Sequence, residues 1–237
     1  PLALSFSKKY KVTAFDINKD KIFELKNSHD RTGEISNKDI SKLKKIYFSN
    51  DIFDLINCNI FIIAVPTPVT KKNKPDLKIL KNACTLVAKV IKKKSIVIFE
   101  STVYPGVTED ICVPILESKS KLKFNKDFFC GYSPERINVG DNKHKLENIT
   151  KIVSGSNIAT TNKIYNLYKK IIRAKIFKAS SIKVAEAAKV IENTQRDLNI
   201  AFLNELSIIF DRLDINTNDV LAAASTKWNF IKFKPGL

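Results

Sequence analysis

The stretch Asn59-Ile-Phe-Ile-Ile-Ala-Val-Pro-Thr-Pro68 decides the fold, because it is an apolar run that two prolines close. A short apolar run without polar alternation is typical of a parallel strand that is buried on both faces. Residues 95–100 form a second such run, which Ser101-Thr102 interrupts. Between the two runs, residues 77–91 place apolar side chains at helical spacing, at Leu80, Cys84, Val87 and Ile91. A strand, a helix and a strand in this order predict a βαβ unit.

The same alternation continues on both sides of this unit. Residues 11–16, 128–132 and 151–154 have the composition of further strands, and residues 18–28 and 107–116 have helical spacing. We therefore predict an α/β fold with a parallel, right-handed, Rossmann-like sheet.

Polar residues follow the expected strands at the points where the strands end. Ligands of parallel α/β sheets bind beyond the carboxyl ends of the strands. The expected ends carry Asp16, Pro66-Thr67, Ser101-Thr102 and Ser133-Pro134-Glu135. We therefore expect these four segments to line a ligand site.

The chain changes character at residue 180. Residues 180–212 contain neither glycine nor proline and keep helical spacing, which predicts one long helix with Ser180-Ser181 at its N-cap. We expect a first domain over residues 1–179, and over 180–237 the long helix and the start of a helical domain. The helix carries apolar side chains on more than one face, which predicts a homodimer interface. These side chains are Val184, Ile191, Leu198, Phe202 and Ile209.

The charge is strongly basic, with 41 Lys and Arg against 24 acids and a net charge of +17. Nucleic-acid-binding proteins share this balance. Here, however, only five of the basic residues are arginines and the lysines are spread along the whole length. Arginine forks that read bases are missing. We interpret the charge as a lysine-rich surface whose field favours a small polyanion such as a nucleotide, with a basic nucleic-acid-binding domain as a minor alternative.

Membrane and metal signals are weak. No apolar run is long enough to cross a bilayer, and the start of the chain does not resemble a secretory signal. The four cysteines lack metal-type spacing, which indicates reduced thiols and a cytoplasmic location without a metal site. The chain contains no methionine and begins with Pro1, and we therefore interpret it as a piece of a longer chain.

Five motifs spaced along the chain carry a resemblance to a known family. They are Val65-Pro-Thr-Pro68 with Lys74-Pro-Asp-Leu77, Glu100-Ser-Thr-Val-Tyr-Pro-Gly106, Ser133-Pro-Glu-Arg136 with Gly140-Asp141, Glu186-Ala-Ala-Lys-Val-Ile-Glu-Asn193, and Thr226-Lys-Trp-Asn-Phe-Ile-Lys-Phe-Lys-Pro-Gly-Leu237. Together they resemble the UDP-glucose/GDP-mannose dehydrogenase family. The resemblance covers essentially the whole chain and is strongest to the UDP-N-acetylhexosamine 6-dehydrogenases of Vi-antigen and O-antigen polysaccharide synthesis.

The resemblance implies an NAD-dependent oxidoreductase. Such an enzyme oxidises the C6 alcohol of a UDP-N-acetylhexosamine to the uronate in two steps, and the motifs leave N-acetylglucosamine and N-acetylgalactosamine open. The alternatives are a UDP-glucose or GDP-mannose 6-dehydrogenase, or an inactive paralogue that acts as a structural partner.

The resemblance also implies truncation at both ends. The family opens with a strand and a Gly-rich phosphate loop, and Pro1-Leu-Ala resembles the helix after that loop. The family's nucleophilic cysteine, in a Gly-Gly-His-Cys motif, is expected a few residues beyond Leu237, and none of the four cysteines here matches it. We therefore expect residues 1–237 to be inactive by themselves.

The resemblance assigns roles to the strand-end residues. Asp16 accepts both ribose hydroxyls of NAD, Lys21 lies near the adenosine end, and Thr67 contacts the cofactor. Thr102 lies near the nicotinamide and the reacting carbon. Glu135 binds the substrate and manages water and protons, as a positioned carboxylate can.

The resemblance also assigns roles in the substrate site. Lys189 and Asn193 lie four residues apart on one helix face, and the family uses this pair to stabilise the oxyanion on the reacting sugar oxygen. Arg136 either pairs with phosphate or braces its loop. The family's loop that closes over the nucleotide sugar matches Lys227, Trp228, Asn229, Phe233, Pro235 and Gly236.

Overall fold

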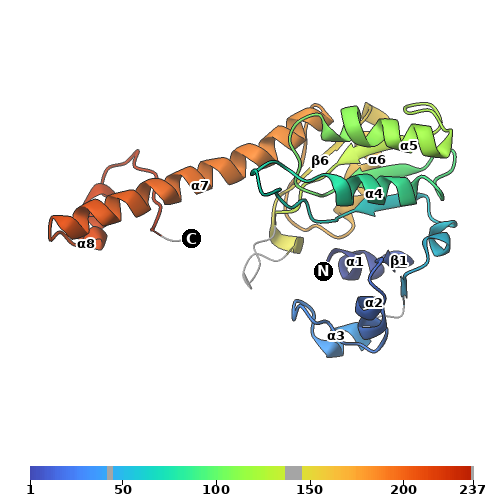
Figure 1. Ribbon diagram of the computed structural model, residues 1–237, viewed down its shortest axis with the longest axis horizontal. Coiled ribbons are helices and arrows are strands. Elements are labelled where there is room, and N and C mark those ends of the chain that lie inside the picture. Colours follow the sequence, from blue (N-terminus) through green and yellow to red (C-terminus); the bar gives the residue numbers. More distant parts are fainter. Residues whose placement is uncertain (42–44, 137–145, 236–237) are drawn as a thin grey trace. The chain divides into compact units, whose positions relative to one another are not determined.

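The computed structural model describes residues 1–41, 45–136 and 146–235 (Figure 1). Gly236 and the Gly140-Asp141 part of the third motif lie outside these residues. The chain forms two compact units, Pro1–Ala187 and Ala188–Leu237, and each is described by itself. The expected domain division at 179/180 stays a prediction.

The first unit contains two sheets. Strands β1 (Val12–Phe15) and β2 (Ile46–Ser49) pair in parallel as a two-stranded sheet. The other sheet has the order β3-β4-β5-β6-β7. Its strands are β3 (Ile60–Ile63), β4 (Ile96–Phe99), β5 (Phe129–Tyr132), β6 (Lys151–Gly155) and β7 (Ile176–Lys178). The predicted α/β, Rossmann-like class is confirmed, whereas β2 and β7 had no counterpart in the sequence prediction.

Strand β6 departs from the predicted all-parallel sheet. It pairs antiparallel with β5, with Gly131 opposite Gly155 and Tyr132 opposite Ser154. A parallel neighbour requires a crossover to the opposite edge of the sheet. Strand β6 instead starts near the edge where β5 ends and runs back along it. This direction places Lys151, its first residue, close to the carboxyl ends of the other strands.

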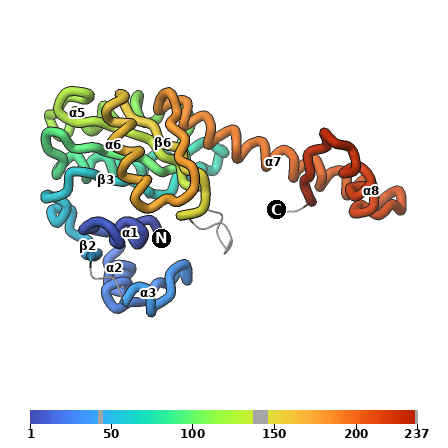
Figure 2. Tube along the Cα trace, turned by 180° about the vertical axis from the view of Figure 1, so that it is seen from behind, coloured from blue at the N-terminus to red at the C-terminus, as the bar shows by residue number. Residues whose placement is uncertain are grey.

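Helices cover both faces of the five-stranded sheet. The opposite views of Figures 1 and 2 show α4 (Lys78–Val87) and α5 (Val113–Ser120) on one face and α6 (Ile158–Lys169) on the other. The described part of this unit also contains the helices α1 (Leu2–Ser7), α2 (Lys19–Lys26), α3 (Asn37–Ser41), η1 (Ile52–Leu55), η2 (Val107–Cys112) and η3 (Leu146–Asn148).

Burial along the two deciding strands differs. All four residues of β4 are buried, as the apolar run predicts. In β3, however, Ile60 is 40% exposed. The prediction that β3 is buried on both faces is therefore wrong at this residue, because β3 is the edge strand of its sheet. The helical stripe of Leu80, Cys84, Val87 and Ile91 is buried as predicted.

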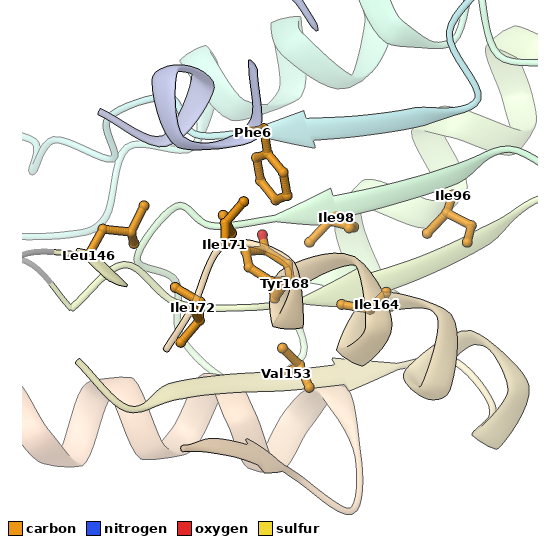
Figure 3. Close-up of a cluster of buried hydrophobic side chains, with 9 residues drawn as sticks. All are labelled: Phe6, Ile96, Ile98, Leu146, Val153, Ile164, Tyr168, Ile171 and Ile172. Atoms are coloured by element: carbon orange, nitrogen blue, oxygen red, sulfur yellow. The ribbon is translucent and has the colours of Figure 1, made fainter. Parts of the chain in front are cut away.

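One core cluster lies between α6 and the sheet (Figure 3). Ile164 and Tyr168 of α6 pack with Ile98 of β4, and Phe6 of α1 meets the ring of Tyr168 edge-on at 5.4 Å between centroids. Ile96, Leu146, Val153, Ile171 and Ile172 complete the cluster.

Two paired glycines allow α6 to approach the sheet closely. A Cβ on Gly131 would collide with Ile164, and a Cβ on Gly155 would lie 2.5 Å from the backbone nitrogen of Thr161. Both positions therefore require glycine for a close approach of helix and strand.

The predicted long helix is α7 (Ile182–Arg212). The hydroxyl of Ser181 accepts a hydrogen bond from the backbone N–H of Val184 at 3.1 Å, which confirms the predicted N-cap. Within the second unit, α8 (Thr217–Ala224) follows α7 and is capped by Asn216. No helix within the described ranges is long and apolar enough to span a membrane.

The four cysteines are free thiols, and Cys84, Cys112 and Cys130 are buried whereas Cys58 is half-buried. A hydrogen bond with Cys84, together with burial, raises the pKa of the Cys112 thiol. Burial raises the pKa of Cys130.

Because the thiolate is the reactive form, iodoacetamide at about pH 8 should modify Cys58 first and the other three only after unfolding. Peptide mass spectrometry measures this order, and prompt labelling of Cys130 in the folded protein would contradict it.

Candidate active site

Three segments that follow β3, β4 and β5 meet at one edge of the sheet, because these strands run parallel. Side chains link the segments to one another. The hydroxyl of Ser101 donates to the carbonyl oxygen of Val65 at 2.6 Å, and that of Tyr132 donates to the carbonyl oxygen of Ser101 at 3.2 Å. The hydroxyl of Ser133 donates to the carbonyl oxygen of Ile152 at 2.7 Å, which adds β6 to the set.

Thr67 and Thr102 occupy two of these segments. Thr102 is exposed between the buried residues Ser101 and Val103, so its side chain faces away from the core. The hydroxyl oxygen of Thr67 is buried without a hydrogen-bond partner among the described residues. Buried hydroxyls are nearly always hydrogen-bonded, so an unsatisfied one points to a group that binds there.

Asp16 follows β1 and forms an ion pair with Lys21, whose Nζ lies 2.7 Å from Asp16 Oδ2. The other carboxylate oxygen of Asp16 accepts a hydrogen bond from the backbone N–H of Asn18 at 3.0 Å. Asn18 also caps α2, so the turn and the helix start hold this pair together. Each carboxylate oxygen keeps acceptor capacity for a ribose hydroxyl. The sequence prediction placed both residues near the cofactor but missed their direct pairing.

Glu135 lies on the loop after β5, and its side chain is 38% exposed. Its Oε1 atom accepts a hydrogen bond from the backbone N–H of Arg136 at 2.6 Å. The guanidinium of Arg136 donates to the carbonyl oxygen of Thr150 at 2.7 Å. This contact braces the loop of Arg136, and the choice between the two roles that the sequence left open stays a prediction.

A buried charged cluster below this loop was missed by the sequence prediction. Lys151 Nζ lies 3.0 Å from Glu100 Oε1, and Tyr168 donates a hydrogen bond to the same oxygen. Burial raises the pKa of Glu100, and the Lys151 ammonium opposes that rise. Burial also raises the pKa of Tyr168, which stays a neutral donor. The available signals in the sequence were Glu100 at the end of one apolar run and Lys151 at the start of another. A charged residue at such a position usually indicates only a solvated strand end.

Glu186 anchors the segment after Thr102. Its buried carboxylate accepts hydrogen bonds from the backbone N–H groups of Gly106 at 2.6 Å and Thr108 at 2.9 Å. Gly106 has a φ of 99°, which favours glycine. Burial raises the pKa of Glu186, and these donors oppose the rise. The sequence prediction quoted Glu186 only as part of a motif and gave it no role.

The remaining expected site residues belong to the second unit. Lys189 and Asn193 lie on α7, and the Asn193 side-chain oxygen accepts a hydrogen bond from Arg196 at 3.0 Å. Phe233 and Pro235 lie in irregular chain after α8, and Gly236 is outside the described residues. Their joining to the strand-end segments stays a prediction. The described residues contain no cluster of His, Cys, Asp and Glu that could hold a metal ion.

A mostly parallel sheet with helices on both faces, a carboxylate after β1 and an unsatisfied buried hydroxyl after β3 are typical of the Rossmann-like dinucleotide-binding domains of dehydrogenases. The chain belongs to the UDP-glucose/GDP-mannose dehydrogenase family. Residues 1–172 match the NAD binding domain of that family, and residues 183–237 match its central domain. The predicted family is confirmed, and so is NAD as the cofactor of its first domain.

Individual relatives agree with this assignment. The chain is 56% identical over 237 residues to Protein CapL of Staphylococcus aureus and 54% identical to UDP-N-acetyl-D-glucosamine 6-dehydrogenase of Pseudomonas aeruginosa. In both cases the match covers 100% of this chain and 56% of the relative, so the chain spans about half of their length. The solved structure of UDP-D-ManNAc dehydrogenase from Pyrococcus horikoshii has a TM-score of 0.91 at 31% identity, covering 100% of this chain and 57% of that one.

The Glu186 anchor yields a stability prediction. Glu186→Gln leaves one acceptor oxygen for two backbone N–H donors and turns an amide group toward one of them. It should lower the free energy of unfolding by about 1–3 kcal/mol, the usual loss for an unsatisfied buried donor. Urea denaturation measures this, with Glu205→Gln on the exposed surface of α7 as the matched control. Equal stability of the two variants would show that Glu186 does not anchor the segment.

Proposed function

We propose that the protein containing this chain is an NAD-dependent UDP-sugar 6-dehydrogenase. Its substrate is a UDP-N-acetylhexosamine, with UDP-N-acetyl-D-glucosamine as the first choice, and its product is the uronate used for surface polysaccharide synthesis in the cytoplasm. The observation that carries the proposal is the set of strand-end groups at one sheet edge, with the unsatisfied Thr67 hydroxyl among them. The identity of 54% to the Pseudomonas aeruginosa enzyme over the whole chain supports the choice of sugar.

NAD, when bound, supplies the hydride acceptor for each of the two oxidation steps. In this chain Asp16 would hold the ribose hydroxyls, and Lys21 would stay beside it at the adenosine end. Thr67 would give its buried hydroxyl a hydrogen-bond partner, and Thr102 would present its exposed hydroxyl to the nicotinamide end. The fit rests on the free acceptor capacity of Asp16 and on the unsatisfied Thr67 oxygen.

The chain's own residues divide the work on the substrate. Lys189 and Asn193 stabilise negative charge on the reacting C6 oxygen. Glu135 orients the substrate and accepts or returns protons, and Arg136 keeps its loop in place. Phe233 and Pro235, together with Gly236, close over the nucleotide sugar.

Oxidation of an alcohol to a carboxylate removes two hydrides and adds one water oxygen. The aldehyde stage therefore requires a nucleophile that holds the carbon until the second hydride leaves. Three of the four cysteines of this chain are buried, and Cys58 follows η1, away from the strand-end segments. In this proposal none of the four cysteines is therefore given the role of the nucleophile.

The homodimer belongs to the proposal as well. Leu198 and Phe202 on α7 are 63% and 60% exposed, and Ile191 and Ile209 add to the apolar surface of the same helix. Exposed apolar area of this kind is typical of a surface that a partner covers. We propose that a second copy of the protein covers it.

Lys189 provides the kinetic test of the function. Lys189→Met in the complete protein should lower kcat by about two to three orders of magnitude with only a modest change in KM, because the cation acts on charge that develops in the transition state. Lys183→Met is the matched control, since Lys183 lies on α7 and pairs with the exposed Asp110.

NADH formation with UDP-N-acetylglucosamine, UDP-N-acetylgalactosamine, UDP-glucose and GDP-mannose identifies the substrate. A kcat within a few-fold of the parent would remove Lys189 from the mechanism, and no turnover of any sugar by the parent would favour the inactive paralogue.

The dimer has its own test. Phe202→Asp in the complete protein should shift the sedimentation coefficient from that of a dimer to that of a monomer at micromolar concentration, because the charge would be buried in the interface. Phe23→Asp on α2 is the matched control, since Phe23 is similarly exposed and lies outside α7. A parent protein that sediments as a monomer would refute the proposed dimer.

A further inference from the structure

Lys151 carries a charge in an unusual place. Its side chain is 3% exposed and that of its partner Glu100 is 1% exposed. Lysine is almost never fully buried unless it is paired, because removing the ammonium from water is costly. A buried ion pair is in general no more stabilising than apolar side chains of similar size. The pair therefore calls for an explanation beyond the stability of the fold.

The contacts of Lys151 point toward the candidate active site. Its ammonium lies 3.0 Å from Glu100 Oε1, donates to the carbonyl oxygen of Pro134 at 3.1 Å and lies 4.0 Å from Glu135 Oε2. Glu100 follows β4, whereas Pro134 and Glu135 follow β5. The ammonium thus connects the ends of two neighbouring strands with the start of β6.

On the side that faces the hydrophobic core, Tyr168 covers the pair of Lys151 and Glu100. Tyr168 of α6 donates a hydrogen bond to Glu100, and its ring lies 5.3 Å from the Lys151 ammonium. The far side of that ring meets Phe6 within the apolar cluster of Figure 3. Lys151 and Glu100 are therefore buried against the hydrophobic core, whereas Glu135 is partly exposed.

We propose that Lys151 is a positioning residue, whose buried ammonium fixes the Pro134 carbonyl and the Glu135 carboxylate, with Glu100 as its counter-ion. This inference rests on the proposed function of Glu135 in the site. The antiparallel direction of β6 is what brings Lys151 to this edge. Arg136 holds the next residue of the same loop, so the loop is held at two successive positions.

A double variant separates positioning from folding. Lys151→Met together with Glu100→Gln removes both buried charges while keeping similar volumes, so the melting temperature should stay within a few degrees of the parent. In the complete protein kcat should fall about 10- to 100-fold, as expected when a catalytic group is misplaced by about 1 Å. KM for NAD should not change, because Asp16 and Thr67 are untouched. Lys175→Met, at an exposed position just before β7, is the matched control.

The titration of Glu135 gives a second readout that does not depend on turnover. A nearby cation favours the ionised carboxylate, so its loss in the single variant Lys151→Met, which keeps Glu100, should move the titration of Glu135 to higher pH. The acidic limb of kcat/KM should move in the same direction. NMR of protein labelled with 13C-glutamate follows the titration, and Glu135→Gln assigns the signal. Among the described residues, the charged groups near Glu135 also include Arg136 and, in this chain, the amino group of Pro1, and the variant changes neither.

The single variant Glu100→Gln should move the titration of Glu135 in the opposite direction. It removes the anion and leaves the ammonium to Glu135, so in folded protein the titration of Glu135 should move to lower pH. A folded double variant whose kcat matches the parent would overturn the role of Lys151, and so would an unmoved titration of Glu135 in Lys151→Met. Failure of the parent to oxidise any UDP-sugar would instead refute the proposed function, and the titration would still decide whether Lys151 controls Glu135.

Discussion

Parallel pairing of β3, β4 and β5 is the constraint from which the candidate site follows. It forces the chain to turn away from the sheet at the same edge after each strand, and each turn leaves polar groups that need partners. The hydroxyls of Ser101, Tyr132 and Ser133 supply those partners across the turns. The turns therefore hold one another in place, and Thr102 and Glu135 are carried on segments whose backbones are already fixed.

The charged pairs at the strand ends differ in how deeply they are buried. Asp16 and Lys21 pair at the surface, where water screens their attraction and where a cofactor can reach them. Glu100 and Lys151 pair in the core, where each requires the other because neither could be buried alone. Glu135 lies between these two environments. The strand ends thus carry one surface pair after β1, in the two-stranded sheet, and one buried pair between β4 and β6 of the five-stranded sheet.

The sequence predicted the elements whose signals are local. Apolar runs located β3 and β4, and helical spacing without glycine or proline located α7. Strand β2 and strand β7 were missed because neither forms a continuous apolar run, since β2 has one buried residue and β7 has none. The direction of β6 was wrong because a strand of five residues carries no record of its neighbour's direction. The family motifs supplied most site residues, whereas the pairing of Lys151 with Glu100 joins distant positions and has no local signature.

The glycine pair between β5 and β6 has a consequence for electrostatics. Thr161, whose backbone nitrogen lies against Gly155, precedes Tyr168 on α6 by two helical turns, about 10 Å along the axis. Because these glycines let α6 pack closely against the sheet, the Tyr168 hydroxyl reaches Glu100. A methyl group at Gly155 would meet the backbone of Thr161 and push α6 away from the sheet, which would draw the Tyr168 phenol back from Glu100. A residue without a side chain thus controls the surroundings of a charge that it does not touch.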